Sequence, residues 1–183
     1  NPVLTRYFAP ERNRLPADVD AIGAAYIERL AEIIDQYLVA IPDDEPIGVM
    51  FSGGIDSGSI LVLVDFLLRR RGQSPSRIKA FTLAVEGQPG DVQQAREFLR
   101  AINLEMLLEP IEVPANQVRW QDAVASIEDY KPLDVQSATM GYALLREIRG
   151  RYPDWRYLID GDGGDENLKD YPIEENPELT IRS

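Results

Sequence analysis

The sequence predicts an α/β fold, a doubly wound parallel sheet with helices on both faces. The first observation is the order of the elements, because short apolar segments alternate with longer segments of helical periodicity along the chain. This alternation is typical of parallel strands joined by right-handed helical crossovers. The second observation is the glycine pair Gly53-Gly54, which lies between the first apolar segment and a helix. Ligands in such folds bind beyond the carboxyl ends of the strands, so this pair marks the predicted site.

Residues 1–40 are expected to form an N-terminal arm and a packing helix. Residues 1–15 combine Pro, Arg and aromatic residues without periodicity. Pro16 suits a first helical turn, and apolar residues recur at helical spacing from Ile22 to Tyr37, which predicts a helix from Pro16 to about Val39. Residues 41–172 are expected to form the α/β domain. Residues 173–183 are expected to be an acidic C-terminal tail.

The α/β domain is predicted to contain four strands and four helices. The first strand precedes Ser52, and the others are predicted at residues 78–85, 104–108 and 157–159 because these segments are apolar and short. Helices are predicted at residues 59–71, 116–130 and 137–149. A further helix is capped by Asp91 and turns Ala95, Leu99 and Ile102 inward.

Composition excludes several classes of function. The 183 residues carry a net charge of −12 with a pI near 4.5, which argues against a nucleic-acid partner because phosphate backbones are held by clustered Lys and Arg. The chain has no Cys and no His. Thiolate nucleophiles, Ser-His-Asp triads and metal sites with Cys or His ligands are therefore excluded. No secretory signal is visible, and the most apolar run, 60–68, is too short to span a bilayer. A cytoplasmic location without a membrane partner is expected.

The segment Ser52-Gly53-Gly54-Ile55-Asp56-Ser57 is the first candidate site. It follows an apolar strand and opens a helix, and the free N–H groups of a first helical turn, together with the helix dipole, favour an anion. Glycine allows a phosphate to approach the backbone closely. A Walker A loop and a dinucleotide-binding fingerprint are both excluded, because the required lysine and the third glycine are missing. The sequence therefore predicts a phosphate ligand of another kind.

The segment 158–166 is the second candidate site. Four carboxylates, Asp160, Asp162, Asp165 and Glu166, alternate here with three glycines. Crowding like charges is unfavourable unless a cation or hydrogen bonds offset it, which suggests a metal. An EF-hand is excluded, because Asp165 would occupy the position that requires glycine. A solvated acidic turn is the alternative interpretation.

Both segments resemble motifs of known families. Residues 52–57 are similar to the Ser-Gly-Gly-x-Asp-Ser pyrophosphate loop (PP-loop) of the N-type ATP pyrophosphatases. Residues 160–166 resemble the Ser-Gly-Glu-Gly-x-Asp-Glu segment of the synthetase domain in asparagine synthetases and the related β-lactam synthetases. The resemblance also includes residues 7–10, 81–85 and 142–145, and thus runs through nearly the whole chain. It implies an adenine nucleotide alpha hydrolase-like fold.

The resemblance implies ATP and Mg²⁺ as cofactors and assigns roles to individual residues. It implies pyrophosphate binding by Ser52, Gly53, Gly54 and Ser57, nucleotide contacts by Met50, Leu83 and Gly161, magnesium binding by Asp56 and Asp165, and substrate contact by Asp162. Asp162 stands where the family has a glutamate, so the charge is kept and the reach is shorter. The implied catalytic residues are Asp56, Asp162 and Asp165.

The resemblance further implies an ATP-dependent carbon–nitrogen ligase. A small-molecule carboxylate, aspartate-like, would be activated as an acyl-adenylate with release of pyrophosphate and then amidated by ammonia or an amine. The glutaminase domain of the family has a nucleophilic Cys that this chain lacks, so a separate glutaminase is a candidate partner. A homodimer is one possible assembly.

Three departures from the family pattern leave the substrate open. Lys131 replaces an acid, Gln136 lies near the position of a bacterial arginine, and the family's catalytic lysine belongs to a helical region beyond residue 183. A nucleotide-binding module without turnover is one alternative. The other is a different PP-loop enzyme, such as a tRNA-modifying one, although this acidic, Cys-free chain does not favour it.

Overall fold

The computed structural model describes residues 18–87 and 90–164. The chain forms two compact units, residues 1–40 and 41–183. In the first unit, helix α1 (Val19–Val39) begins after Asp18, whose Oδ1 accepts the N–H groups of Asp20 and Ala21 at 3.0 and 3.2 Å. The predicted start at Pro16 lies outside the described residues. Asp18 supplies the cap that the sequence analysis did not identify.

The second unit contains a parallel four-stranded sheet, as predicted. Its strands are β1 (Ile47–Met50), β2 (Ile78–Val85), β3 (Leu108–Val113) and β4 (Tyr157–Ile159), in the order β3-β2-β1-β4. Strand β1 pairs with both β2 and β4, so that Val49 lies beside Ala80 on one side and Ile159 on the other. The chain therefore moves from β1 through β2 to β3 on one side, and the next connection crosses back to place β4 on the other side of β1. This reversal puts the topological switch point at the carboxyl ends of β1 and β4.

The third strand was predicted too early in the chain. Residues 105–107 form a 3₁₀ turn, and β3 starts at Leu108. Pro110 lies inside β3, where it removes one ladder donor. It is tolerated because β3 is the edge of the described sheet. The mostly apolar segment 104–108 predicts a strand, but its residues 105–107 form the turn that leads into β3, and only Leu108 belongs to the strand.

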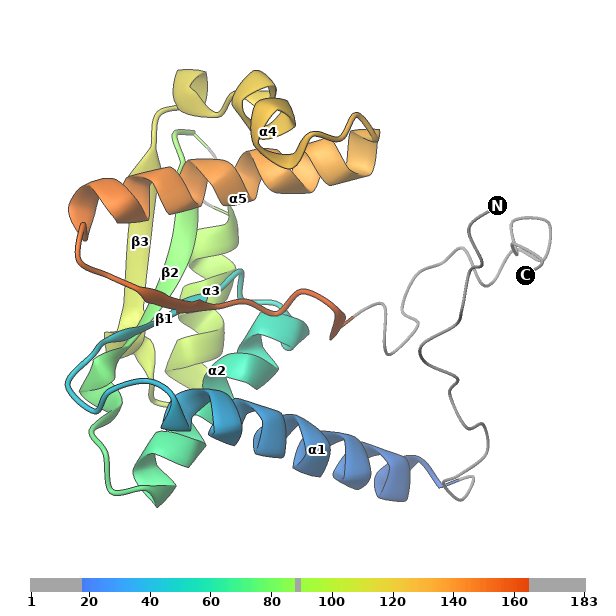
Figure 1. Ribbon diagram of the computed structural model, residues 1–183, viewed down its shortest axis with the longest axis vertical. Helices are drawn as coiled ribbons and strands as arrows, with labels where there is room; N and C mark the ends of the chain where they lie inside the picture. Colours follow the sequence, from blue (N-terminus) through green and yellow to red (C-terminus); the bar gives the residue numbers. More distant parts are fainter. Residues whose placement is uncertain (1–17, 88–89, 165–183) are drawn as a thin grey trace, which may run out of the picture. The chain divides into compact units, whose positions relative to one another are not determined.

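Helices cover both faces of the sheet. Figure 1 shows α5 (Pro132–Arg151) crossing one face of β2 and β3, with α2 (Ile55–Arg70) and α3 (Gly90–Ala101) on the other face. Helix α4 (Trp120–Ile127) packs on α5. The predicted helices were right in order but not in their limits, since α2 and α5 begin earlier than predicted and α4 is shorter. Ile102, predicted to face inward, lies beyond the end of α3 and is exposed. Among the described helices, none is long and apolar enough to cross a membrane.

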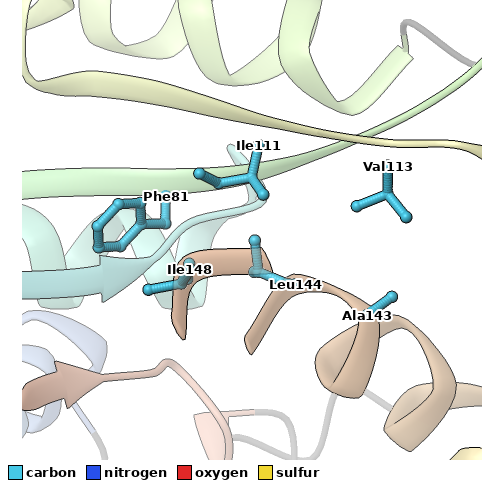
Figure 2. Close-up of a cluster of buried hydrophobic side chains, with 6 residues drawn as sticks. All are labelled: Phe81, Ile111, Val113, Ala143, Leu144 and Ile148. Atoms are coloured by element: carbon cyan, nitrogen blue, oxygen red, sulfur yellow. The ribbon is translucent and has the colours of Figure 1, made fainter. Parts of the chain in front are cut away.

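The interface between α5 and the sheet forms a buried apolar cluster. Figure 2 shows side chains of β2 and β3 facing those of α5, and the six buried members are Phe81, Ile111, Val113, Ala143, Leu144 and Ile148. The ring of Phe81 lies 5.1 Å from Trp155 and 5.6 Å from Tyr152, measured between centroids. This cluster fixes α5 across the sheet and so positions the wall that α5 contributes to the site.

A polar cluster at the start of β2 and β3 gives a stability prediction. Glu109 accepts hydrogen bonds from Lys79 Nζ at 2.8 Å and from Tyr152 Oη at 2.6 Å. Partial burial raises the pKa of Glu109, but the hydrogen bonds from Lys79 and Tyr152 together outweigh this effect, and the pKa lies below its ordinary value. We expect Glu109→Gln to lower the free energy of unfolding at pH 7 by about 1–2 kcal/mol, since hydrogen bonds to a charged group are lost.

The pH dependence follows from the direction of that shift. A carboxyl with a lowered folded pKa stabilises the protein above its ordinary pKa and loses this contribution as the pH falls through the folded pKa. The difference between wild type and Glu109→Gln should therefore be greatest near neutral pH and shrink in acid, as measured by urea unfolding. The control Glu112→Gln, on an exposed residue of β3, should change stability by less than about 0.5 kcal/mol. A Glu109→Gln difference independent of pH would contradict the prediction.

Candidate functional site

The segment between β1 and α2 forms a tight turn that requires glycine. Gly53 has φ +83°, and a Cβ there would lie 2.6 Å from the backbone N of Ala95 on α3. Gly54 is the N-cap of α2 in extended conformation, with no side-chain cap. The first-turn N–H groups of α2 have no carbonyl four residues earlier in the helix. The turn therefore brings a glycine-dependent backbone to an uncapped helix start, an arrangement that generally favours an anion.

Hydroxyl groups hold this turn together. The Ser52 N–H donates to Ser57 Oγ at 3.3 Å, and the two hydroxyl oxygens lie 3.2 Å apart. The Gly54 N–H donates to Ser52 Oγ at 3.2 Å. Ser57 is buried and Ser52 is exposed. Because each hydroxyl binds backbone within the loop, both serines fix its shape before any ligand arrives.

The two candidate segments meet, although they are far apart in the sequence. A Cβ on Gly161 would lie 2.6 Å from the backbone N of Ser57, and a Cβ on Gly164 would overlap the carboxylate of Asp56. This contact arises because β4 pairs directly with β1. Asp165, the other residue expected to bind magnesium, lies outside the described residues. Residues 18–87 and 90–164 contain no group of three or more His, Cys, Asp or Glu that could hold a metal ion.

A pocket of about 600 Å³ opens where these segments meet. Seven of the predicted site residues line it: Met50, Ser52, Asp56, Ser57, Leu83, Gly161 and Asp162. Gly53 and Gly54 shape the turn beside it without being part of its lining. The remaining lining comes from Phe51 and Asp160, which follow β1 and β4, from Thr82 in β2, from Asp91 at the start of α3, and from α4 and α5. The sequence analysis did not foresee the contribution of the last two helices, since periodicity does not show which helix borders a cavity.

Thr82 is a site residue that the sequence analysis missed. It is 0% exposed, and its Oγ1 donates to the carbonyl oxygen of Phe51 at 2.7 Å. The Phe51 N–H donates in turn to the Phe81 carbonyl at 2.8 Å. Thr82 thus extends the contact between β1 and β2 by one residue. It holds the chain where it enters the loop Ser52–Ser57, called the Ser52 loop below. The sequence signals were a hydroxyl within a mostly apolar strand and the place of Thr82 within residues 81–85, which the family resemblance includes without giving Thr82 a role.

Replacing Thr82 should separate the role of its hydroxyl from that of its volume. Thr82→Val leaves the Phe51 carbonyl without this donor, and we expect the free energy of unfolding to fall by about 1–3 kcal/mol. Thr82→Ser keeps the donor and loses one methyl group, at a cost of about 1 kcal/mol. Urea unfolding of both variants tests this expectation. Valine proving no worse than serine would show that the hydrogen bond does not matter.

The fold and the site define a class of protein. A parallel sheet whose first strand leads through a glycine turn into a helix, with a glycine-rich segment of a neighbouring strand packed against it, is the architecture of a PP-loop, adenine nucleotide alpha hydrolase-like domain. The family model described as asparagine synthase matches residues 28–182. The chain belongs to the asparagine synthase family.

Curated relatives agree with this assignment. A probable glutamine-hydrolysing asparagine synthetase of Acanthamoeba polyphaga mimivirus is 31% identical over 164 residues, which cover 89% of this chain and 27% of the viral protein. The root asparagine synthetase of Pisum sativum is 25% identical over 134 residues, covering 70% and 22% of the two chains. The chain thus spans about a quarter of the length of these curated relatives.

Proposed function

We propose that this domain catalyses ATP-dependent amide formation by activating a substrate carboxylate as an acyl-adenylate. The observation that carries the proposal is the meeting of the Ser52–Ser57 loop and the Gly161–Gly164 segment at one pocket. Membership of the asparagine synthase family supports it. The names of these relatives include glutamine hydrolysis. In this domain the amine would be ammonia or another amine delivered to the same pocket, with a separate glutaminase as one source of ammonia.

Each part of the pocket suits one part of the nucleotide. The N–H groups at the start of α2 and the Ser52 loop, with Gly53, Gly54 and Ser57, would hold the pyrophosphate of ATP. Met50, the last residue of β1, and Leu83, in the C-terminal half of β2, would border the adenosine, with Gly161 beside it. These three residues line the pocket next to the loop. Asp162 would contact the carboxylate substrate.

Asp56 and Asp165 would hold Mg²⁺. The Asp56 carboxylate lies against the backbone of Gly164, the residue directly before Asp165 in the sequence, and carboxylate oxygens suit this hard cation. Bound magnesium would supply charge neutralisation for the phosphates of ATP. The described lining of the pocket is acidic, because its charged residues are Asp56, Asp91, Asp160 and Asp162. Among the described residues that line the pocket, the positive potential for a phosphate would therefore come from backbone N–H groups.

The reaction would proceed in two steps. A carboxylate oxygen attacks the α-phosphorus, the bond from that phosphorus to the bridging oxygen breaks, and pyrophosphate leaves with the electron pair into the Ser52 loop. The amine nitrogen then attacks the acyl carbon, AMP leaves, and the nitrogen loses a proton to give the amide. In the first step, N–H groups aimed at the departing pyrophosphate stabilise the growing charge.

Pyrophosphate exchange tests this proposal in the full-length protein. Labelled pyrophosphate should enter ATP only when an acceptable carboxylate and magnesium are both present. Calorimetry with ATP and magnesium should show binding in parallel. Binding without exchange for any carboxylate would favour the nucleotide-binding module, and modification of tRNA would favour the other PP-loop enzymes.

A further inference from the structure

Two carboxylates that line the pocket have no role in the proposed function, those of Asp91 and Asp160. Asp160 Oδ1 accepts the Asp162 N–H at 3.4 Å and thus contributes to the shape of its own turn. Asp91 lies in the first turn of α3 and is exposed. An acidic residue there stabilises a helix through the helix dipole. This effect does not require the side chain to border a cavity, as Asp91 does.

Helix α3 is packed against the start of α2 at the Ser52 loop. A Cβ on Gly53 would lie 2.6 Å from the backbone N of Ala95, and a Cβ on Gly58 would lie 2.6 Å from the ring of Phe98. These contacts fix the N-terminal part of α3 beside the loop. Asp91 precedes Ala95 by about one helical turn and therefore borders the pocket next to the loop proposed to hold pyrophosphate.

The strand order puts Asp91 on the nucleotide side of the pocket. Because the order is β3-β2-β1-β4, the segments that follow β2 and β4 lie on opposite sides of the Ser52 loop, which follows β1. Asp91 follows β2, the strand of Leu83, which is proposed to border the adenosine. Asp162 follows β4 and is proposed to contact the carboxylate substrate. Asp91 thus lies near the part of ATP that joins adenosine to pyrophosphate, which contains the ribose.

The ribose offers what a carboxylate at this place needs. A carboxylate near the phosphates of ATP is unfavourable unless a hydrogen-bond donor or a cation meets it. The ribose has two hydroxyl donors and no charge, and an ionised carboxylate accepts such bonds. In dinucleotide-binding α/β sheets, an acidic residue further along the chain holds a ribose hydroxyl in this way.

We propose that the Asp91 carboxylate accepts hydrogen bonds from the ribose hydroxyls of ATP and so positions the nucleotide over the Ser52 loop. This inference rests on the proposed function, because it assigns a residue to the nucleotide of that site. It makes Asp91 the residue by which the pocket distinguishes ATP from its deoxy analogues.

Calorimetry with the full-length protein and magnesium tests the inference. The nucleotides are ATP, 2′-deoxyATP and 3′-deoxyATP. We expect the wild type to bind at least one deoxy analogue at least ten-fold more weakly than ATP, since a hydrogen bond to a charged group is lost. In Asp91→Ala the affinity for ATP should fall to about that for the analogue, so that their ratio approaches one. Asp91→Asn, which keeps one acceptor oxygen, should have an intermediate ratio.

The ratio separates ribose binding from a structural role. If Asp91 served only the helix dipole or a metal ion, Asp91→Ala would weaken binding of all three nucleotides equally, and this result would overturn the inference. Equal binding of the three by the wild type would overturn it too. The matched control is Glu97→Ala, on the same helix, exposed and not part of the lining, which should keep the wild-type ratio. Urea unfolding checks that each variant folds.

Pyrophosphate exchange shows which proposal fails. A ratio that depends on Asp91, without exchange for any carboxylate, would overturn the proposed function and leave the role of Asp91 standing. Exchange with a wild-type ratio in Asp91→Ala would overturn the role of Asp91 alone. Absence of ATP binding by the folded wild type would overturn both.

Discussion

Asp56→Asn is expected to lower carboxylate-dependent pyrophosphate exchange by about 10²–10³-fold, the size typical of losing one electrostatic contact in a transition state. Asp56 lies in the first turn of α2, borders the pocket, and places its carboxylate against Gly164. Asparagine keeps the size of the side chain and removes the charge that would hold magnesium. The exchange rate should be measured over a range of magnesium concentrations, because a lost ligand also raises the concentration needed for half-maximal rate.

Asp65→Asn is the matched control for this experiment. Asp65 is on the same helix, where it pairs with Arg69 at 2.8 Å, and it borders a different pocket. Its removal should cost less than about 1 kcal/mol of stability, as is usual for ion pairs four residues apart on a helix, and leave exchange near the wild-type rate. Exchange that survives Asp56→Asn at every magnesium concentration would refute the assigned metal ligand.

Gly161→Ala is expected to reduce the affinity for ATP at least ten-fold. The added Cβ would lie 2.6 Å from the backbone N of Ser57 and 2.9 Å from the Asp56 carbonyl carbon. Real Cβ atoms do not approach backbone this closely, so β4 or the first turn of α2 must shift. Overpacking of this kind typically costs about 1–3 kcal/mol, and the shift moves the N–H groups proposed to bind pyrophosphate. Calorimetry with ATP and magnesium, together with urea unfolding, measures both effects.

Gly150→Ala provides the control for a glycine replacement elsewhere in the unit. A Cβ on Gly150 meets nothing within 4 Å, and the residue lies inside α5. Alanine there should stabilise the protein by about 0.5–1 kcal/mol, because it favours the helix, and should not change ATP binding. Normal affinity for ATP in Gly161→Ala would show that the two segments do not act as one site.

Local signals carried the sequence predictions that were confirmed. The parallel α/β fold followed from alternating strand and helix patterns. The limits of β2 were predicted correctly because residues 78–85 are mostly apolar. The positive φ of Gly53 agrees with the tight turn expected of the glycine pair. The errors occurred where a local pattern was compatible with two structures, as in residues 104–108, of which 105–107 form a turn before β3 instead of the strand.

Only part of the candidate site could be predicted from the sequence. The motif residues could be named individually, and seven of them line one pocket. Thr82 and the lining residues of α4 and α5 could not be assigned, although the resemblance runs through residues 81–85 and 142–145. Their own sequence does not distinguish a buried hydroxyl that binds a neighbouring strand, or a helix face that borders a cavity, from ordinary core residues. Their roles depend on which elements lie beside them.

The sequence by itself determined the class of fold, the two glycine-rich segments and the absence of Cys and His chemistry, because these depend on residue type and local periodicity. Only the tertiary structure decided that β4 pairs with β1, that Gly161 and Gly164 therefore pack on Ser57 and Asp56, and that α4 and α5 line the other side of the pocket. The physical reason is that strand order and helix docking arise from contacts between residues far apart in the chain. No local pattern of residue types specifies which of these distant residues will meet.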